Sequence, residues 1–304
     1  MSFLPQWRRE SGVASKLGVE GDINYGPYIY VAPLILLYLI FLAYPLTQAV
    51  LMAFQQFPSL NETEWVGLAN FRTVLQDPVF WTSLKNTAVV AIGKAVVPIV
   101  LGLGLALELD SAIKGDTGFR AAIFLPYVVP IAVVGILFTW LFSNSGLVNA
   151  FLLELGLIES RLPWISSSDL AMPVVLILNI WRNTGYFMVI LLAGLQGIPD
   201  SMYDAAKVMG RSRWEMFRHI TLPLLKPSLV IVGVLGILES VKGFADVWLV
   251  AQGGPNHATE VIATYFYKET FLYFKFGKGA AIGWIIFVIT IGLSMILIKV
   301  SGDE

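Results

Sequence analysis

The chain has 304 residues, of which 57% are hydrophobic and only 13% carry a charged side chain, and its formal net charge at pH 7 is −1. Soluble domains are typically about a quarter charged, so this composition, with a mean hydropathy of +0.74, indicates a polytopic membrane protein. The small net charge offers no bulk attraction for nucleic acid. The absence of cysteine excludes disulfides, thiolate chemistry and cysteine-based metal sites.

The N-terminal segment, residues 1–27, is mixed and polar. We interpret it as a cytoplasmic tail and not as a signal peptide, because the first apolar run begins late and lacks a small-residue cleavage pattern. A membrane-spanning helix needs roughly 20 apolar residues. About six segments meet this length and predict an all-α membrane fold, namely 28–54, 84–107, 120–142, 170–195, 224–250 and 278–299.

The distribution of lysine and arginine predicts the orientation of these spans, because cytoplasmic loops are enriched in both residues. The bias favours a cytoplasmic location for both termini and for the polar loop 199–223. The predicted domains are the tail 1–27, a first transmembrane helix with its outer loop over 28–80, and a transmembrane core over 81–304. His219 and His257 would then lie on opposite sides of the membrane, so they cannot share a metal ion.

The outer loops are expected over 55–80, 143–168 and 251–277. Residues 148–158 of the second loop have the pattern of a short amphipathic helix. The third loop opens with Gly253-Gly254-Pro255, a strong turn signal, and continues into an aromatic run. That run is equally consistent with an interfacial helix and with a surface on which another protein docks.

The loop 199–223 is the longest polar run in the second half of the chain and is rich in lysine and arginine. We expect two short helices there, with Gly210 in the left-handed conformation that ends the first and Ser212 capping the second. One small apolar face is predicted on the first helix: Met202, Ala205, Ala206 and Met209. Such a loop could bind a groove on a partner protein, or it could lie on the lipid headgroups.

The order of residues in this loop resembles the signature loop of the membrane subunits of binding-protein-dependent ABC importers. That signature is Glu-Ala-Ala, three residues, Gly, about nine residues, and Ile-x-Leu-Pro; here Asp204 stands in place of the Glu, and Met209 stands where Asp is frequent. The resemblance implies that the loop inserts into a cleft on a cytoplasmic ATPase. The implied coupling residues are Asp204, Ala205, Ala206, Gly210, Trp214, Phe217, Leu222 and Pro223.

Two outer segments are similar to those of carbohydrate permeases, and to the first maltose-permease subunit in particular. They are 67–71, followed by Asp77-Pro78, and the Gly-Gly-Pro turn at 253–255; the usual Phe-Asp pair is interrupted as Phe244-Ala245-Asp246. The resemblance implies a type I ABC importer transmembrane domain in the cytoplasmic membrane. It implies four partner chains: a second permease subunit in a heterodimer, two cytoplasmic ATPases and an extracytoplasmic solute-binding protein. ATP and Mg²⁺ would bind the ATPases, and this chain would bind no cofactor.

Charged residues at membrane depth are costly, so they usually face a cavity or one another. Five such residues occur: Lys94, Arg182, Glu239, Lys242 and Asp246. Glu239, Lys242 and Asp246 are three and four residues apart, which predicts that they line one helix face. They would form either an internal acid–base–acid ladder or part of a polar path. The sequence assigns no role to Lys94.

The fourth predicted span places polar groups beside aromatic ones, the combination that binds sugar hydroxyls and the C–H face of a sugar ring. The same side chains could instead serve interhelical hydrogen bonds. The candidate substrate-binding residues, partly implied by the resemblance, are Asn179, Arg182, Asn183, Tyr186, Glu239, Ser240, Lys242 and Asp246. Tyr127 and Trp140 of the third span are interpreted as packing residues.

The sequence contains no phosphate-binding Gly-x4-Gly-Lys-Ser/Thr loop, Gly-x-Ser-x-Gly or His-Glu-x-x-His, so we do not expect an ATPase or hydrolase. The preferred hypothesis is a permease subunit of an ATP-driven importer of a di- or oligosaccharide. One alternative is import of glycerol phosphate or another polar solute, since Arg182 could hold a phosphate. Another is an ion-coupled secondary carrier in which Glu239, Lys242 and Asp246 relay protons.

Overall fold

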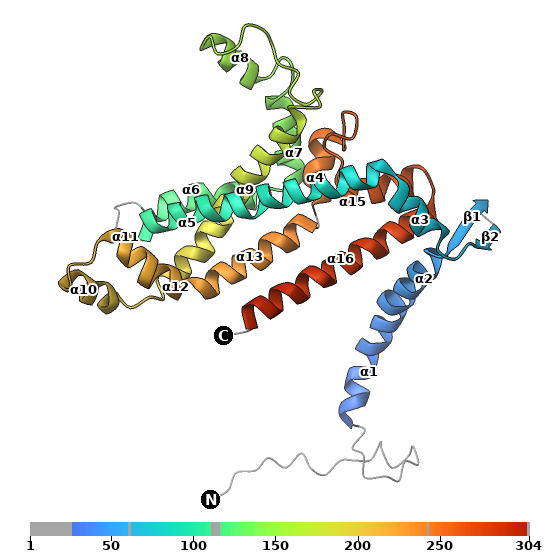
Figure 1. Ribbon diagram of the computed structural model, residues 1–304, viewed down its shortest axis with the longest axis horizontal. Helices are drawn as coiled ribbons and strands as arrows, with labels where there is room; N and C mark the ends of the chain where they lie inside the picture. The colour runs from blue at the N-terminus through green and yellow to red at the C-terminus, as the bar shows by residue number, and fades with distance from the viewer. Residues whose placement is uncertain (1–25, 60–61, 111–115, 242, 303–304) are drawn as a thin grey trace, which may run out of the picture. The chain divides into compact units, whose positions relative to one another are not determined.

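The computed structural model describes residues 26–59, 62–110, 116–241 and 243–302. The chain forms two compact units, residues 1–52 and 53–304. The described part of the first unit is one helical run (Figure 1, blue), made of α1 (Gly26–Tyr38), the π-helical turn η2 (Leu39–Ala43) and α2 (Tyr44–Met52). Its most apolar stretch buries no side chain within the chain, so its surface suits lipid or another helix better than water.

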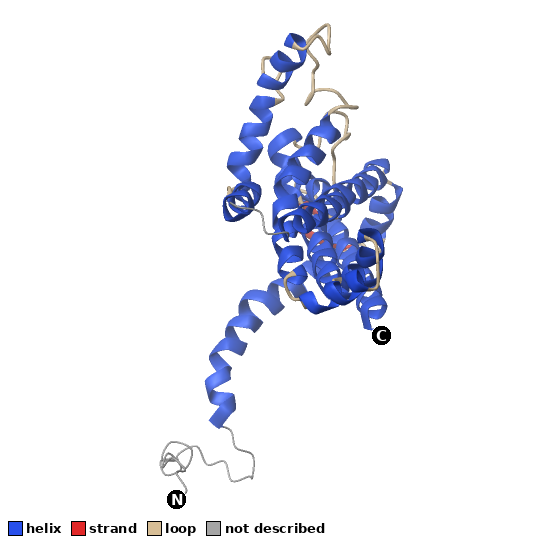
Figure 2. Cartoon of the chain, turned by 90° about the vertical axis from the view of Figure 1, so that its left-hand side faces the viewer, coloured by secondary structure: helices blue, strands red, loops and turns tan. Residues whose placement is uncertain are grey.

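The second unit begins with an antiparallel hairpin of β1 (Gln55–Ser59) and β2 (Glu62–Trp65). Helices make up the other regular structure of its described residues (Figure 2). In chain order they are α3 (Ala69–Gln76), α4 (Pro78–Lys94), α5 (Val96–Asp110), α6 (Asp116–Val128), α7 (Ile131–Leu141), α8 (Leu147–Glu154), α9 (Ala171–Leu195), α10 (Asp200–Val208), α11 (Arg213–Met216), η3 (Phe217–Thr221), α12 (Leu222–Leu224), α13 (Lys226–Val241), α14 (Phe244–Ala251), α15 (Ile262–Tyr267), η4 (Lys268–Leu272) and α16 (Phe276–Gly302). The predicted all-α membrane fold is confirmed, with this small hairpin added.

Three helical runs among the described residues are long and apolar enough to cross a membrane: Tyr30–Met52, Pro78–Asp110 and Ala171–Leu195. The third predicted span is a helix pair, because α6 and α7 meet at 91°. Pro130 precedes α7 with φ −53° and ψ 133°, outside the helical region, and its missing backbone N–H removes a helical hydrogen bond where the chain bends. A second bend, of 65°, separates the run that ends with α12 from α13.

The fifth predicted span is not a continuous helix. α13 ends at Val241, α14 begins at Phe244, and Gly243 between them has φ −68° and ψ 44°. A Cβ at Gly243 would lie 3.0 Å from the Ser240 carbonyl oxygen, so a side chain would crowd this tight turn. The prediction that Glu239 and Asp246 share a helix face with Lys242 is therefore wrong: the two acids belong to different helices, and Lys242 lies outside the described residues.

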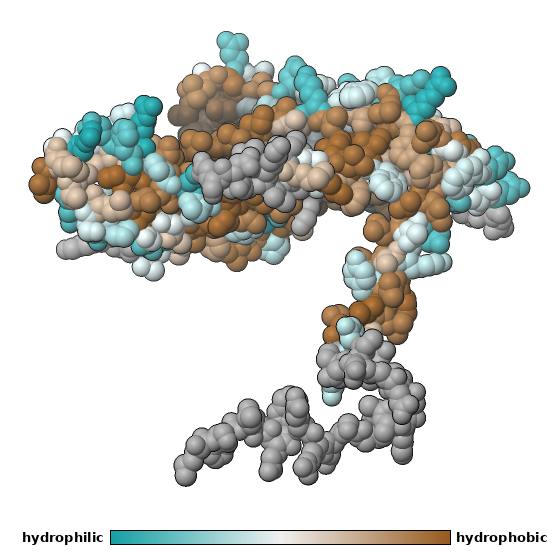
Figure 3. All heavy atoms as spheres, turned by 60° about the horizontal axis from the view of Figure 1, so that its bottom comes forward, coloured by the Kyte–Doolittle hydropathy of each residue, from teal (hydrophilic) through white to brown (hydrophobic). Residues whose placement is uncertain are grey.

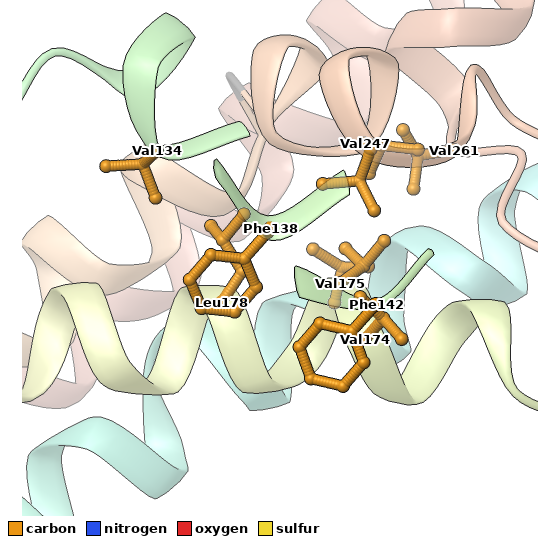
Figure 4. Packing of buried hydrophobic residues seen from close by; sticks show 10 residues of the cluster. Val134, Phe138, Phe142, Val174, Val175, Leu178, Val247 and Val261 are labelled. Atoms are coloured by element: carbon orange, nitrogen blue, oxygen red, sulfur yellow. The ribbon is translucent and has the colours of Figure 1, made fainter. Parts of the chain in front are cut away.

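Helix α9 is the centre of the second unit, with α4, α5, α6, α7, α13 and α14 packed against it. Figure 4 shows one of its cores, where Val134 and Phe138 of α7, Val175 and Leu178 of α9, and Val247 of α14 meet. Apolar side chains gain no hydrophobic free energy by leaving lipid, so such helices associate through close packing.

Glycines permit this close packing at two contacts with α9. A Cβ on Gly102 of α5 would lie 2.9 Å from the backbone nitrogen of Met188, and one on Gly185 would lie 2.0 Å from the carbonyl oxygen of Ile123 in α6. Hydrophobic residues cover the middle of the second unit, and hydrophilic residues gather at its left-hand end, where α10 and α11 lie (Figure 3). This distribution is typical of a bundle whose middle faces lipid.

Candidate functional site

Residues 199–223, which we call the elbow, fold as two short helices joined by a left-handed turn. Gly210 has φ +72°, as predicted, and its N–H donates to the carbonyl of Lys207 at 2.9 Å. The N–H of Arg211 donates to the carbonyl of Ala206 at 3.0 Å. These two bonds are the Schellman pattern that closes a helix C-terminus, so the direction of the chain after α10 is fixed locally.

The second helix of the elbow starts at a capping box. The Glu215 N–H donates to the Ser212 hydroxyl at 3.2 Å, and the Ser212 N–H donates to the Glu215 carboxylate at 2.8 Å. The prediction that Ser212 caps this helix is confirmed. Three hydrogen bonds to the Glu215 carboxylate hold its pKa below the ordinary value. The bond from the Ser212 backbone has the largest effect, and those from the Ser212 hydroxyl and Arg211 follow. The cap thus remains formed at neutral pH.

One side of the elbow packs against the bundle and the other is exposed. Tyr203 and Ile220 pack against the core between α5, α9 and α13, and the Tyr203 hydroxyl lies 3.0 Å from the Thr221 hydroxyl. By contrast, Val208 is 90% exposed and Trp214 is 67% exposed. The elbow therefore presents large apolar side chains away from the bundle on a rigid base.

Of the apolar face predicted for the first helix of the elbow, Met202, Ala205 and Met209 are exposed and Ala206 is buried. This exposure suits a face that binds a partner protein, one of the two roles that the sequence left open for the loop. The other predicted coupling residues lie along this surface: Asp204 pairs with Lys207, Trp214 stacks on Phe217, and Leu222 and Pro223 open α12.

A second polar cluster lies at membrane depth on α9. Asn179, Arg182, Asn183 and Tyr186 share one face of this helix, as their spacing requires. The Asn179 amide donates to the Val175 carbonyl at 2.8 Å. Within the described part of the chain, Asn183 Nδ2 and Arg182 Nε are buried without a hydrogen-bond partner.

Tyr127 of α6 completes this cluster, although the sequence suggested only a packing role for it. Its ring stacks on Tyr186 with centroids 4.2 Å apart and planes 7° from parallel. The Arg182 guanidinium lies 4.9 Å from the same ring and donates to the Tyr127 carbonyl at 3.4 Å. The cluster therefore combines an aromatic platform, an amide and a guanidinium.

Two of the other predicted substrate residues, Ser240 and Asp246, have partners within the chain. Ser240 is buried, and its hydroxyl donates to the Gly236 carbonyl at 2.6 Å. Asp246 is buried in an ion pair with Lys94 of α4. Lys94 Nζ also donates to the Glu239 carbonyl at 3.1 Å. The sequence predicts Lys94 as a charge at membrane depth, but no sequence pattern indicates that it contacts Glu239 and Asp246, which lie far from it in the chain.

The end of the bundle opposite the elbow is held by ion pairs. The Lys278 ammonium lies 2.7 Å from the Asp77 carboxylate and 3.1 Å from that of Glu269, and the Tyr265 hydroxyl donates to Asp77 at 2.7 Å. Partial burial raises the pKa of Asp77, but the bonds from Lys278 and Tyr265 outweigh it and hold the pKa below the ordinary value. Burial and the bond to Asp77 raise the pKa of Tyr265.

The segment that follows the Gly-Gly-Pro turn is also fixed by α4. The Asn86 amide donates to the carbonyls of His257, Ala258 and Glu260 at 3.0–3.1 Å. The fully buried Glu260 carboxylate accepts from Lys268 at 2.5 Å. The loop is therefore a shaped, rigid surface. The described residues hold no group of three or more His, Cys, Asp or Glu side chains that could bind a metal ion.

Comparison with known proteins identifies the family. Residues 98–301 match the binding-protein-dependent transport system inner membrane component family. The chain is 34% identical to a probable ABC transporter permease of Pyrococcus horikoshii, over 87% of this chain and 92% of that protein. It is also 34% identical to the arabinooligosaccharides transport system permease protein AraP of Bacillus subtilis, over 91% of this chain and 88% of that protein.

A solved structure agrees with the sequence matches. The chain resembles, with a TM-score of 0.79 and 26% identity, a subunit of a bacterial ABC transporter involved in the import of the acidic polysaccharide alginate; the likeness covers 90% of this chain and 94% of that one. The family match accounts for the multi-pass apolar bundle. The chain belongs to the binding-protein-dependent transport system inner membrane component family and is a permease subunit of an ABC importer.

Proposed function

We propose that this chain is one of two different permease subunits of a carbohydrate importer and that it moves a di- or oligosaccharide across the cytoplasmic membrane. Two independent observations support the sugar class. Two of the similar proteins are named for the transport of arabinooligosaccharides and of alginate, both of which are carbohydrates. The cluster on α9 has the chemistry that binds a sugar, with stacked rings beside unpartnered polar atoms.

The observation that carries the proposal is the stack of Tyr127 on Tyr186 beside the buried, unpartnered Nδ2 of Asn183 and Nε of Arg182. A buried donor without a partner costs about 1–3 kcal/mol, so a site that leaves two of them open is suited to a ligand that accepts hydrogen bonds. Sugar hydroxyls supply those acceptors, and the C–H face of a pyranose or furanose ring can cover the tyrosine platform. Glu239 can accept from a further hydroxyl.

Asn179, Ser240 and Asp246 stay predictions as sugar contacts, as does Lys242. The first three already bond within the chain, so they would contact a substrate only after exchanging those partners. We therefore place the primary contacts at Arg182, Asn183, Tyr186 and Glu239, with Tyr127 added.

In this proposal the elbow and both termini face the cytoplasm, and one of the two ATPase subunits binds the exposed side of the elbow. An ATPase groove would receive the apolar side chains of Val208, Met209 and Trp214, which the fold leaves uncovered. The opposite end, with its rigid Gly-Gly-Pro loop, faces outward and receives a soluble binding protein. Closure of the ATPases, transmitted through the elbow, drives the spans between inward-facing and outward-facing states.

The test is uptake by the complete transporter, with both permeases, its ATPases and its binding protein, in proteoliposomes. Asn183→Leu is expected to raise the KM for the sugar at least severalfold, because a hydroxyl loses its donor. The control is Gln196→Leu, which removes an exposed amide at the end of the same helix. Unchanged sugar kinetics in Asn183→Leu, with a complex present in normal amount, would refute the assignment.

A second candidate substrate class is an anionic sugar, and Arg182 is the observation that favours it. Its guanidinium is held by the Tyr127 ring and carbonyl, and its Nε points to no acceptor within the described residues. If the substrate is anionic, Arg182→Gln abolishes uptake, whereas it weakens uptake of a neutral sugar only modestly. Uptake assays with a neutral oligosaccharide, a uronic-acid oligosaccharide and glycerol phosphate distinguish these cases.

A further inference from the structure

Lys94 is a buried lysine whose role neither the sequence nor the family match assigns. It lies midway along the apolar run Pro78–Asp110, and its side chain is 5% exposed. It is the last residue of α4 and directly precedes Ala95, which separates α4 from α5. An ionised side chain at the middle of a membrane span is expensive, so its retention calls for a specific partner and a specific role.

The partners of Lys94 lie on both sides of the break in the fifth span. Its ammonium forms the ion pair with Asp246, in the first turn of α14, and donates at 3.1 Å to the carbonyl of Glu239, in the last turn of α13. A Cβ on Gly243 would lie 3.1 Å from the same nitrogen, so the break itself wraps closely around Lys94. One cation thus holds the two halves of the broken span to α4.

Each contact gives a partner to a polar group that the break in the helix would otherwise leave unpaired. A carbonyl in the last turn of a helix has no intrahelical partner, and the negative end of the helix dipole favours a cation there. A carboxylate in the first turn of the next helix is favoured by the opposite end of that helix's dipole. Lys94 joins these two ends, and a methionine or leucine of similar size could do neither.

The two halves of the broken span have different neighbours. α13 packs against α4, α5 and α9, whereas α14 packs against α7, α9 and α15. The halves could therefore move separately when the transporter changes conformation, with the break at Gly243 acting as the hinge. A hinge of this kind transmits motion only if its geometry is defined.

We propose that Lys94 is a positioning residue for transport, fixing the angle between α13 and α14 through its contacts with Asp246 and the Glu239 carbonyl. The inference rests on the proposed function, because it gives Lys94 a part in the transport cycle. Its near-complete burial excludes direct contact with a sugar in this conformation. A buried ion pair adds little stability over apolar residues of similar size, so its value here is geometric.

The test compares three variants of the complete transporter: Lys94→Met, Asp246→Leu and the double variant. The single variants leave one buried charge unpaired and are expected to lower the amount of complex in the membrane. The double variant removes both charges, so it should recover assembly yet hydrolyse severalfold more ATP per sugar imported than the wild type. Lys85→Met, which removes an exposed lysine from the same helix, is the control and should match the wild type.

A distance measurement tests the geometry independently of any substrate. The chain has no cysteine, so Leu238→Cys in α13 and Ala245→Cys in α14 can carry spin labels on either side of the break. We expect a narrow distance distribution with Lys94 present and a broad one in the double variant. A narrow distribution and a normal ATP-to-sugar ratio in the double variant would overturn the inference, as would loss of assembly in every variant. If the wild type imports none of the sugars tested, the proposed substrate is wrong, while the label distances still decide the role of Lys94.

Discussion

Substitution of Gly210 isolates the contribution of the elbow's geometry to coupling. Gly210 has φ +72°, and a Cβ added there would meet no atom within 4 Å, so Gly210→Ala introduces no clash within the chain. The cost is that of a left-handed backbone for an L-residue, roughly 1–2 kcal/mol. That cost shifts the balance between the native turn and any alternative by about 5- to 30-fold. Gly210→Asn should be milder, because asparagine tolerates this conformation.

Gly156 provides a matched control, since it has φ +69° and equally open surroundings but lies outside the elbow. Gly156→Ala carries the same local cost without touching the proposed ATPase contact. In proteoliposomes, we expect binding-protein-stimulated ATP hydrolysis and sugar uptake to fall severalfold in Gly210→Ala, less in Gly210→Asn and not in Gly156→Ala. Equal loss in Gly156→Ala and Gly210→Ala, or full activity in both, would refute the reasoning.

Three further predictions concern stability. The pKa of Asp77 is lower in the folded protein than its ordinary value of 3.8. The ionised carboxylate therefore stabilises the fold above pH 3.8, and this stabilisation is lost as the pH falls through the folded pKa. Asp77→Asn should accordingly flatten the acid side of a plot of Tm against pH. Asn149→Ala should cost about 1–3 kcal/mol and speed hydrogen exchange over residues 159–166, because the Asn149 amide bonds both backbone and side-chain groups there; normal protection would contradict it. Gly185→Ala forces α6 off α9 and should lower the thermal stability of the complex, whereas Gly104→Ala, which meets no atom within 4 Å, should not.

The sequence predicted the features that depend on composition and local pattern. Apolar length located the first, second and fourth spans, and Gly210 and Ser212 located the turn and the cap of the elbow. The resemblance of the elbow to a signature loop led to the family, which the match over residues 98–301 confirms. These features are encoded within a few neighbouring residues, so they can be found without knowledge of tertiary packing.

The features that sequence reasoning missed depend on contacts between distant segments. The spacing of Glu239 and Asp246 fits a single helix face, and only the packed structure shows the break at Gly243 and the pairing of Asp246 with Lys94. The role of Tyr127 was missed for the same reason, because its partner Tyr186 lies on another helix. The spacing argument assumes that the helix is unbroken, and in this chain the break lies between Glu239 and Asp246.

The central claim is that a separate ATPase binds the elbow. Its most direct test uses the absence of cysteine from this chain. Val208, 90% exposed in the elbow, is changed to cysteine, and the exposed Thr82 at the opposite end of the bundle serves as the control. With a short bifunctional reagent in native membranes, the account predicts a crosslink from position 208 to the ATPase subunit whose yield changes with ATP, and none from position 82. If position 208 reacts freely with a soluble thiol reagent but never crosslinks to an ATPase, the account is contradicted.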